Sequence, residues 1–156
     1  KKAAEHGHLE AQNALGVCYA NGEGVPMDRM AGISWIRKAA EQGFADAQLN
    51  MSSFYDIDSG TPDPFEAVKW YRLAAENGVA KAQYFLAVYL YMGHDVREDK
   101  PEAIKWLKLA AEQGNARAQK FLGDCYIGGE GVPEDKAEAK KWQDKAAENR
   151  PEANRE

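Results

Sequence analysis

The sequence predicts an all-α fold, a helical solenoid of about four helix-turn-helix repeats. The first observation is the spacing of its four tryptophans along the 156 residues, at intervals of 35, 36 and 36 positions. They are Trp35, Trp70, Trp106 and Trp142. The second observation is an Ala-Ala pair four residues after each tryptophan, and the third is an Ala-Gln pair in every unit. A period of about 35 residues is typical of stacked helix pairs.

The first helix of each unit is predicted around its Ala-Gln pair. In the first unit this helix runs near Glu10–Asn21, where Leu15 and Tyr19 recur at helical spacing with other apolar residues. The equivalent helices start near Asp46, Lys81 and Arg117. Each first helix is therefore expected to bury one face in the core and to leave the other face free.

The second helix of each unit is predicted from its start and stop signals. It begins at a repeated aspartate, a residue type that caps helix N-termini: Asp28, Asp63, Asp99 and Asp135. Three of these aspartates are followed three residues later by glutamate, which predicts a reciprocal capping box. The helix ends at a repeated glycine, as a left-handed C-cap requires: Gly43, Gly78 and Gly114.

The turn within a unit carries the phrase Gly-Glu-Gly-Val-Pro in the first and fourth units, at residues 22–26 and 129–133. Its glycines supply positive φ angles. The second and third units have other residues at 58–62 and 93–97, and they also lack the glycine found at positions 16 and 123. We therefore expect the turns of the two middle units to differ in geometry.

Composition excludes several classes of protein. Twenty basic against 25 acidic residues give a net charge of −5, the wrong sign for neutralising the phosphates of a nucleic acid. No stretch approaches the ~18 apolar residues of a membrane-spanning helix. Cys18 and Cys125 occupy the same repeat position three repeats apart. If helices pack ~8–10 Å apart, their sulfurs lie roughly 25 Å from each other, too far for a disulfide within one chain.

The repeat resembles the Sel-1-like repeat family, a relative of the tetratricopeptide repeats. The resemblance rests on the phrase Ala-Gln…Leu-Gly…Tyr…Gly-Glu-Gly-Val-Pro…Asp…Trp…Lys-Ala-Ala-Glu-Gln-Gly and covers residues 1–149. The units run over residues 1–38, 39–73, 74–109 and 110–149, and residues 150–156 form a C-terminal tail. The resemblance implies a right-handed α/α superhelix and a role as an adaptor or scaffold, most often in bacteria.

The two ends of the sequence also carry expectations. Residues 1–7 match the tail of a second helix, so at least one further repeat is expected upstream. The last helix turns polar at Lys140 and Gln143, as the terminal cap of a repeat array would. The cellular compartment and the oligomeric state stay open.

Candidate chemical sites in the sequence are weak. His6 and His8 lack further ligands for a metal, and in segment 56–66 the glycine and glutamate fall early for a calcium loop. A serine β-lactamase needs Ser-x-x-Lys and Lys-Thr-Gly, and neither occurs. We therefore expect a protein that is not an enzyme, with no catalytic residue, no cofactor and no metal. A β-lactam-binding or hydrolase-type member of the family stays an alternative, and so does an architectural spacer.

The free surface of the first helices is the expected binding groove for a protein or peptide partner. In the helix-pair solenoids that this chain resembles, the first helices line the concave face. The groove positions left free by the core are Asn13, Val17, Ala20, Asn21, Asp46, Leu49, Ser53, Asp56, Ile57, Lys81, Tyr84, Val88, Tyr91, Met92, Arg117, Lys120, Asp124 and Ile127.

The third unit stands out in this groove, because aromatic and soft apolar side chains are typical interface anchors. The alternative is that Tyr91 and Met92 only cover the altered third turn. Arg117 and Lys120 make the groove of the fourth unit basic, whereas residues 39–73 carry two basic and six acidic residues, a net −4. A partner segment is therefore expected to be oriented by charge.

Overall fold

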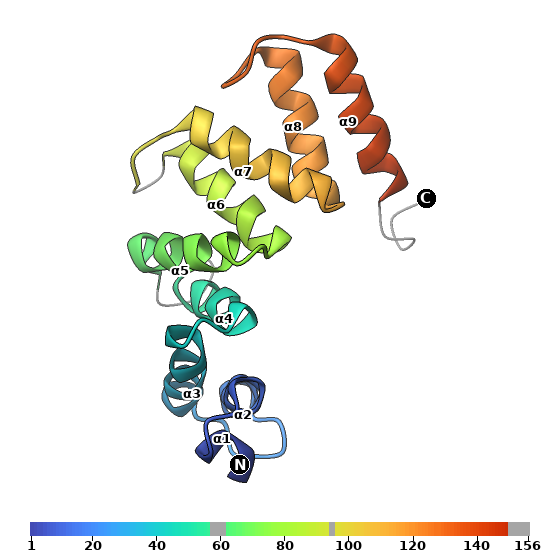
Figure 1. Ribbon diagram of the computed structural model, residues 1–156. Coiled ribbons are helices and arrows are strands. Elements are labelled where there is room, and N and C mark those ends of the chain that lie inside the picture. Colours follow the sequence, from blue (N-terminus) through green and yellow to red (C-terminus); the bar gives the residue numbers. More distant parts are fainter. Residues whose placement is uncertain (57–61, 94–95, 150–156) are drawn as a thin grey trace. The chain divides into compact units, whose positions relative to one another are not determined.

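The computed structural model describes residues 1–56, 62–93 and 96–149, and in those residues it contains nine α-helices and no strand (Figure 1). The helices are α1 (Lys2–Glu5), α2 (Leu9–Asn21), α3 (Arg29–Glu41), α4 (Ala45–Tyr55), α5 (Pro64–Glu76), α6 (Ala80–Met92), α7 (Lys100–Glu112), α8 (Ala116–Gly128) and α9 (Lys136–Glu148). They pair as α2–α3, α4–α5, α6–α7 and α8–α9. The predicted all-α arrangement of four helix-turn-helix repeats is confirmed.

The helices form two compact units, an N-terminal unit (Lys1–Asn77) with α1 to α5 and a C-terminal unit (Gly78–Glu156) with α6 to α9. Each first helix begins one residue before its predicted start. The predicted left-handed glycines follow α3, α5 and α7, with φ of 87°, 84° and 85°: Gly43, Gly78 and Gly114. Glycines with positive φ also follow α2, α6 and α8, with φ of 74°, 64° and 66°: Gly22, Gly93 and Gly129. Residues 57–61 and 94–95 of the two divergent turns, and the tail 150–156, lie outside the described residues.

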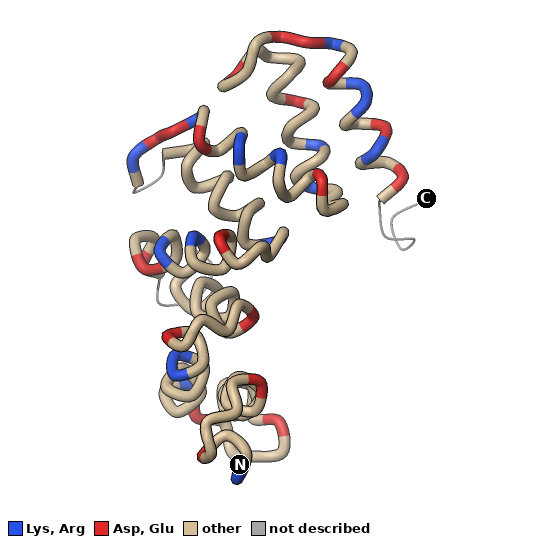
Figure 2. The backbone as a smooth tube through the Cα atoms, in the orientation of Figure 1, with Lys and Arg blue, Asp and Glu red and all other residues tan. Residues whose placement is uncertain are grey.

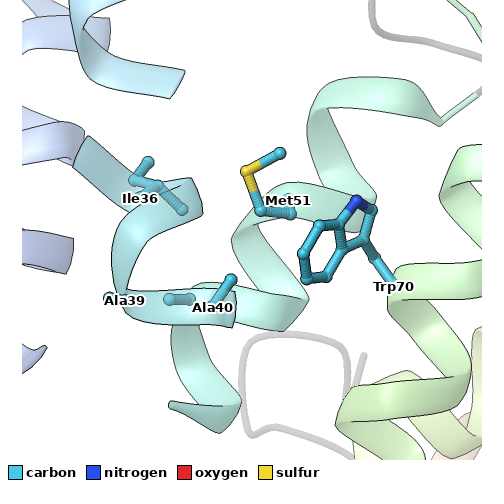
Figure 3. Close-up of a cluster of buried hydrophobic side chains, with 6 residues drawn as sticks. Ile36, Ala39, Ala40, Met51 and Trp70 are labelled. Carbon is cyan, nitrogen blue, oxygen red and sulfur yellow. The ribbon is translucent and has the colours of Figure 1, made fainter. Parts of the chain in front are cut away.

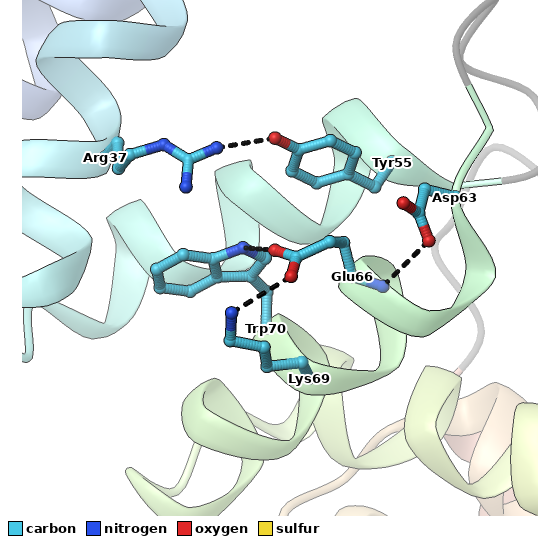
Figure 4. Close-up of polar contacts among 6 residues, drawn as sticks. All are labelled: Arg37, Tyr55, Asp63, Glu66, Lys69 and Trp70. Carbon is cyan, nitrogen blue, oxygen red and sulfur yellow. Dashed lines mark hydrogen bonds and ion pairs between the residues drawn. The ribbon is translucent and has the colours of Figure 1, made fainter.

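The predicted aspartates cap the second helices. The Asp63 carboxylate accepts a hydrogen bond from the Glu66 backbone N–H at 3.2 Å (Figure 4), and Asp99 accepts one from Glu102 at 2.9 Å. The predicted reciprocal hydrogen bond, from the aspartate backbone N–H to the glutamate side chain, is wrong. The Asp63 backbone N–H donates instead to the Tyr55 carbonyl at 2.9 Å, so it has no need of a glutamate side chain.

Two of the three glutamates of the expected capping boxes bond to tryptophans, and the third, Glu138, accepts from Lys141. Trp70 Nε1 donates to Glu66 at 3.2 Å, and Lys69 Nζ approaches the same carboxylate at 3.0 Å (Figure 4). In the next repeat Trp106 Nε1 donates to Glu102 at 3.2 Å. Because an indole N–H at the edge of a core needs an acceptor, Glu66 and Glu102 fix the orientation of the tryptophan ring.

The core of the N-terminal unit is a cluster of buried side chains from α3, α4 and α5. Ile36, Met51 and Trp70 are 0%, 0% and 3% exposed, and the Ala39-Ala40 pair lies between the helices (Figure 3). The small alanines allow the helices to approach closely, and the large side chains fill the remaining space. Trp70 is therefore a core residue of the repeat.

The core of the C-terminal unit uses the same repeat positions. Leu86, Leu107 and Leu122 are each 0% exposed, and Trp142 of α9 is 7% exposed. The Ala110-Ala111 pair is again fully buried beside them. Each repeat thus supplies a short stretch of core from its own two helices and from the helix that follows or precedes it.

The tightest helix contact that glycine permits lies between α2 and α3. A Cβ atom placed on Gly16 would lie 2.5 Å from Ile36 Cγ1 and 2.7 Å from the Gly32 carbonyl oxygen. A Cβ on Gly32 would lie 2.7 Å from the Gly16 carbonyl oxygen. At the equivalent position of α8, a Cβ on Gly123 would lie 3.0 Å from Gln143 Cγ. Two facing glycines are therefore required in the first repeat, and the fourth repeat is less crowded.

A buried glutamine from each first helix contacts the C-terminal ends of second helices; we call these residues, Gln12, Gln48, Gln83 and Gln119, the glutamine bridges. Gln48 Nε2 donates to the Ala40 carbonyl of α3 at 3.2 Å, and its Oε1 accepts from Asn77 beyond α5 at 2.8 Å. Gln119 repeats the arrangement with the carbonyl of α7 residue Ala111 at 2.9 Å. The Ala40 and Ala111 carbonyls also accept the backbone N–H of Gly43 and Gly114 at 3.0 Å, so the glutamine adds a second hydrogen bond at the end of each helix.

Candidate partner-binding surface

The expected groove residues of α2 lie at the surface of the N-terminal unit but are held by contacts within it. Asn13 Oδ1 accepts a hydrogen bond from Asn50 Nδ2 of α4 at 2.9 Å. Val17 is half-buried and packs against the Ile36–Met51–Trp70 core cluster. Both side chains therefore join α2 to the rest of the unit, which leaves little of their surface for a partner.

The expected groove residues of α4 are also used within the N-terminal unit. Asp56, directly after α4, accepts a hydrogen bond from the buried Tyr71 hydroxyl of α5. Ser53 is exposed, and its Oγ donates to the Leu49 carbonyl at 3.1 Å. Leu49 itself is half-buried. The first helices of this unit therefore offer few uncommitted polar groups.

In the C-terminal unit, α6 has one buried and one exposed face. Residues 82, 83, 86, 87, 89 and 90 are buried, whereas Lys81 is exposed and Met92 is 57% exposed. Tyr84 and Val88 lie between them on the exposed face and are half-buried. The spacing of 81, 84, 88 and 92 places all four side chains on one side of the helix.

The exposed face of α8 carries mostly charged residues. Arg117, Lys120 and Asp124 are exposed, and Ile127 in the last turn is 50% exposed. The opposite face is buried in the core at Leu122 and at its neighbours on that side. The four predicted groove residues of α8 are thus all accessible.

Tyr91 differs from the other expected groove residues because it bonds to the turn of the fourth repeat. Its hydroxyl donates to Glu130 Oε2 at 2.6 Å, and Lys100 Nζ lies 3.0 Å from the same oxygen. The Tyr91 ring meets Phe121 of α8 edge to face, with centroids 4.8 Å apart. Tyr91 therefore links α6 to α8 and to the fourth turn.

The pKa values around Tyr91 reflect this contact. Burial, followed by the hydrogen bond to Glu130, raises the pKa of Tyr91 well above its ordinary value. The same hydrogen bond, and then the one from Lys100, lower the pKa of Glu130. Burial raises the pKa of the neighbouring Cys125 thiol to about 11. The sequence offered one signal for this cluster, the glutamate repeated within the two Gly-Glu-Gly turns, but not its partners.

The charge on the first helices reverses between the two units. The second residue of each first helix is Glu10 in α2 and Asp46 in α4, but Lys81 in α6 and Arg117 in α8. Figure 2 shows these charges along the chain, with acidic residues red and basic residues blue. The first turns of α6 and α8 contain no acidic residue.

The remaining candidate sites show no grouping of reactive side chains. In the ranges 1–56, 62–93 and 96–149, no three His, Cys, Asp or Glu side chains gather to hold a metal ion. His6 Nδ1 bonds to the Lys2 carbonyl at 2.6 Å at the end of α1, and Cys18 and Cys125 are both free thiols. His94 and most of the glycine-containing part of segment 56–66 lie outside the described residues. None of the helices described is long and apolar enough to cross a membrane.

Comparison with known proteins places the repeat in a family. The model of the Sel1 repeat matches residues 9–44, 45–79, 80–115 and 116–150. A protective antigen present in uropathogenic Escherichia coli strains, which displays an SLR fold, is similar over 96% of this chain and 32% of its own, with 38% identity and a TM-score of 0.90. A Sel1 repeat protein from Oxalobacter formigenes is similar over 94% of this chain and 43% of its own, with 35% identity and a TM-score of 0.89.

A third structure, Helicobacter pylori cysteine rich protein B, shares the fold at 20% identity and a TM-score of 0.63, over 81% of this chain and 92% of its own. This chain spans less than half the length of the first two relatives. Four matched repeats cover nearly all of its residues. The chain belongs to the Sel1 repeat family.

Proposed function

We propose that the chain is a non-catalytic protein-interaction module that binds a protein or peptide partner on the exposed faces of α6 and α8. We call these two faces together the α6–α8 surface; the edge-to-face contact of Tyr91 with Phe121 joins the helices that carry them. This surface consists of Lys81, Tyr84, Val88, Met92, Arg117, Lys120, Asp124 and Ile127. One observation carries the proposal. The core positions have the same kind of residue in every repeat, whereas the residues at the positions of this surface differ from repeat to repeat.

The α6–α8 surface has side chains that the repeat itself does not require. The core positions of both helices are already filled, as the complete burial of Leu86 and Leu122 indicates. Met92 and Ile127 nevertheless expose 57% and 50% of their surfaces. Because exposing aliphatic surface to water is unfavourable, their position at the end of a helix face favours a role in binding.

Charges on the surface are also available for a partner. Within the described part of the chain, no ion pair to Arg117 or Lys120 is found within 4.0 Å, and both side chains are exposed. Unpaired charges beside apolar area give an interface orientation and specificity. Membership of a helical repeat family also favours a binding role, since such repeats present extended surfaces.

A random-peptide display selection with residues 1–156 tests this proposal. We expect enriched peptides whose binding is lost in Val88→Asp, because a carboxylate at the centre of the surface removes its apolar character. Ser53→Asp, at the equivalent position of α4, is the matched control and should bind the same peptides as the unchanged chain. Circular dichroism of both variants checks that the helices remain.

Two results would contradict the proposal. One is a selection without any enriched peptide, and the other is enriched peptides that bind Val88→Asp as tightly as the original chain. Turnover of nitrocefin, or covalent labelling by penicillin, would favour the hydrolase alternative instead.

A further inference from the structure

We infer that the partner of the α6–α8 surface is a protein segment with carboxylates at one end and aliphatic side chains about 15 Å away. The inference rests on the proposed function and names the chemistry of the partner. It follows from the order in which charged and apolar residues occur along both helices.

The N-terminal ends of α6 and α8 form the basic side of the surface. Lys81 and Arg117 are each the second residue of their helix, and Lys120 lies one turn further along α8. A helix N-terminus already carries a partial positive charge, so cations there oppose the dipole and cost helix stability. Three such cations, with no acidic residue in either first turn, attract an external carboxylate.

The first turns of α6 and α8 can be compared with those of the other two first helices. In α2 and α4 the first turn carries Glu10 or Asp46, which suits the helix dipole. A sequence that gives up this local preference in two consecutive repeats does so at a position where the fold gains nothing. Binding of an acidic group accounts for the exchange.

The C-terminal ends of the same helices form the apolar side. Met92 is the last residue of α6, and Ile127 is the last but one of α8. Each lies ten or eleven residues beyond the cation of its helix, which corresponds to about 15 Å along the axis. Asp124 lies one turn before Ile127 and repels carboxylates from this end. The surface therefore distinguishes the two ends of a bound segment.

An acidic peptide fits this surface better than a nucleic acid does. Phosphates would use the three cations, but Asp124, Met92 and Ile127 give a phosphate backbone nothing to bond. The whole chain carries a net charge of −5, which further disfavours a polyanion. A peptide that lies extended along the helices advances about 3.3 Å per residue, so about five residues separate its acidic and aliphatic groups.

Titration of residues 1–156 with capped peptides tests the inference. The probe is acetyl-Glu-Glu-Ser-Ser-Ser-Leu-Leu-amide, and its controls replace both Glu with Lys or both Leu with Ser. We expect each control to bind at least about tenfold more weakly, since each loses one side of the surface. Amide chemical-shift changes should fall on α6 and α8.

Charge reversal sharpens the test. Lys120→Glu should weaken the Glu-Leu peptide about tenfold and favour the Lys-Leu peptide, whereas Lys140→Glu on α9 makes the same change in net charge and should alter binding less than twofold. Equal binding of the Glu and Lys peptides overturns the inference, as does tighter binding of a single-stranded oligonucleotide. If the designed peptides do not bind but display-selected peptides do, only the inference is overturned. Failure of both overturns the proposed function as well.

Discussion

The N-terminal and C-terminal units have the same core and different surfaces. Both bury an Ala-Ala pair, a large aliphatic residue and a tryptophan at matching positions, and both contain glutamine bridges. The first helices of the N-terminal unit carry a carboxylate in their first turn. The expected groove residues Asn13 and Asp56 of this unit form hydrogen bonds within it. The first helices of the C-terminal unit start with cations and leave apolar groups exposed. The comparison teaches that the core positions of the repeat stay constant while its exposed positions vary from unit to unit.

The largest expected effect concerns tryptophan. Trp70→Ala should lower the free energy of unfolding by about 3–5 kcal/mol, because a 3% exposed ring leaves a cavity among Ile36 and Met51. Trp106 is half-buried, so Trp106→Ala should cost about 1–3 kcal/mol. Urea denaturation followed by circular dichroism measures both values. Equal losses would contradict the unequal burial of the two rings.

The second-largest expected effect concerns glycine substitutions, which should destabilise the N-terminal unit more than the C-terminal unit. Gly32→Ala should destabilise the chain by about 2–3 kcal/mol, since its Cβ would meet the Gly16 carbonyl oxygen at 2.7 Å. Gly123→Ala should cost much less, because the gain in helix propensity, about 1 kcal/mol, offsets milder contacts with Gln143 Cγ at 3.0 Å and the Ala139 carbonyl oxygen at 3.1 Å. Thermal melting of both variants checks the difference. Similar melting temperatures would show that the first repeat relaxes around the added methyl group.

The glutamine bridges should behave alike in the two units. Gln48→Ala and Gln119→Ala each remove a buried side-chain hydrogen bond to a helix-end carbonyl, that of Ala40 or Ala111, which keeps its backbone donor, so each should cost about 0.5–1.5 kcal/mol. The free energies of unfolding should agree within about 0.5 kcal/mol. A loss in one variant alone would mean that the bridge belongs to one unit rather than to the repeat.

The smallest effect is a pH dependence confined to the C-terminal unit. The pKa of Cys125 rises on burial from an ordinary 9.0 to about 11. A raised pKa stabilises the fold below pH 9, and this contribution is lost as the pH rises toward 11, because the unfolded chain then releases a proton that the folded chain retains.

Melting curves at pH 9 and pH 11 measure this contribution. The unchanged chain should lose about 4 °C more than Cys125→Ala over this interval. Cys18→Ala, at the equivalent position of α2, is the control and should follow the unchanged chain. Parallel losses in all three proteins would contradict the assignment to Cys125.

Local signals made most of the fold predictable. The aspartates and glycines act on their own turns, so the helix boundaries follow from residues that are neighbours in sequence. The hydrogen-bond partner of the Glu66 side chain was not predictable from local sequence. Its expected partner, the Asp63 N–H, bonds to the Tyr55 carbonyl, and that contact depends on how two helices pack.

The exposure of residues on the candidate surface was predictable from the sequence, but their contacts were not. Helical spacing alone identifies Lys120 and Asp124 as exposed residues of their helix. The contacts of Tyr91 depend on where the fourth turn lies, and those of Asn13 depend on the distance to Asn50 in the next repeat. Spacing gives the face of a helix, whereas the partner across a repeat boundary requires coordinates.

The glutamine bridges have a consequence for how the helices open. Isolated helix ends fray, and their amide hydrogens exchange with solvent fastest. In α3 and α7 the carbonyl near the C-terminal end accepts a buried hydrogen bond from the following repeat, so local opening there must also break a contact outside the helix. The last turns of these two helices are therefore expected to exchange their amide hydrogens more slowly than free helix ends, because their opening is coupled to the neighbouring repeat.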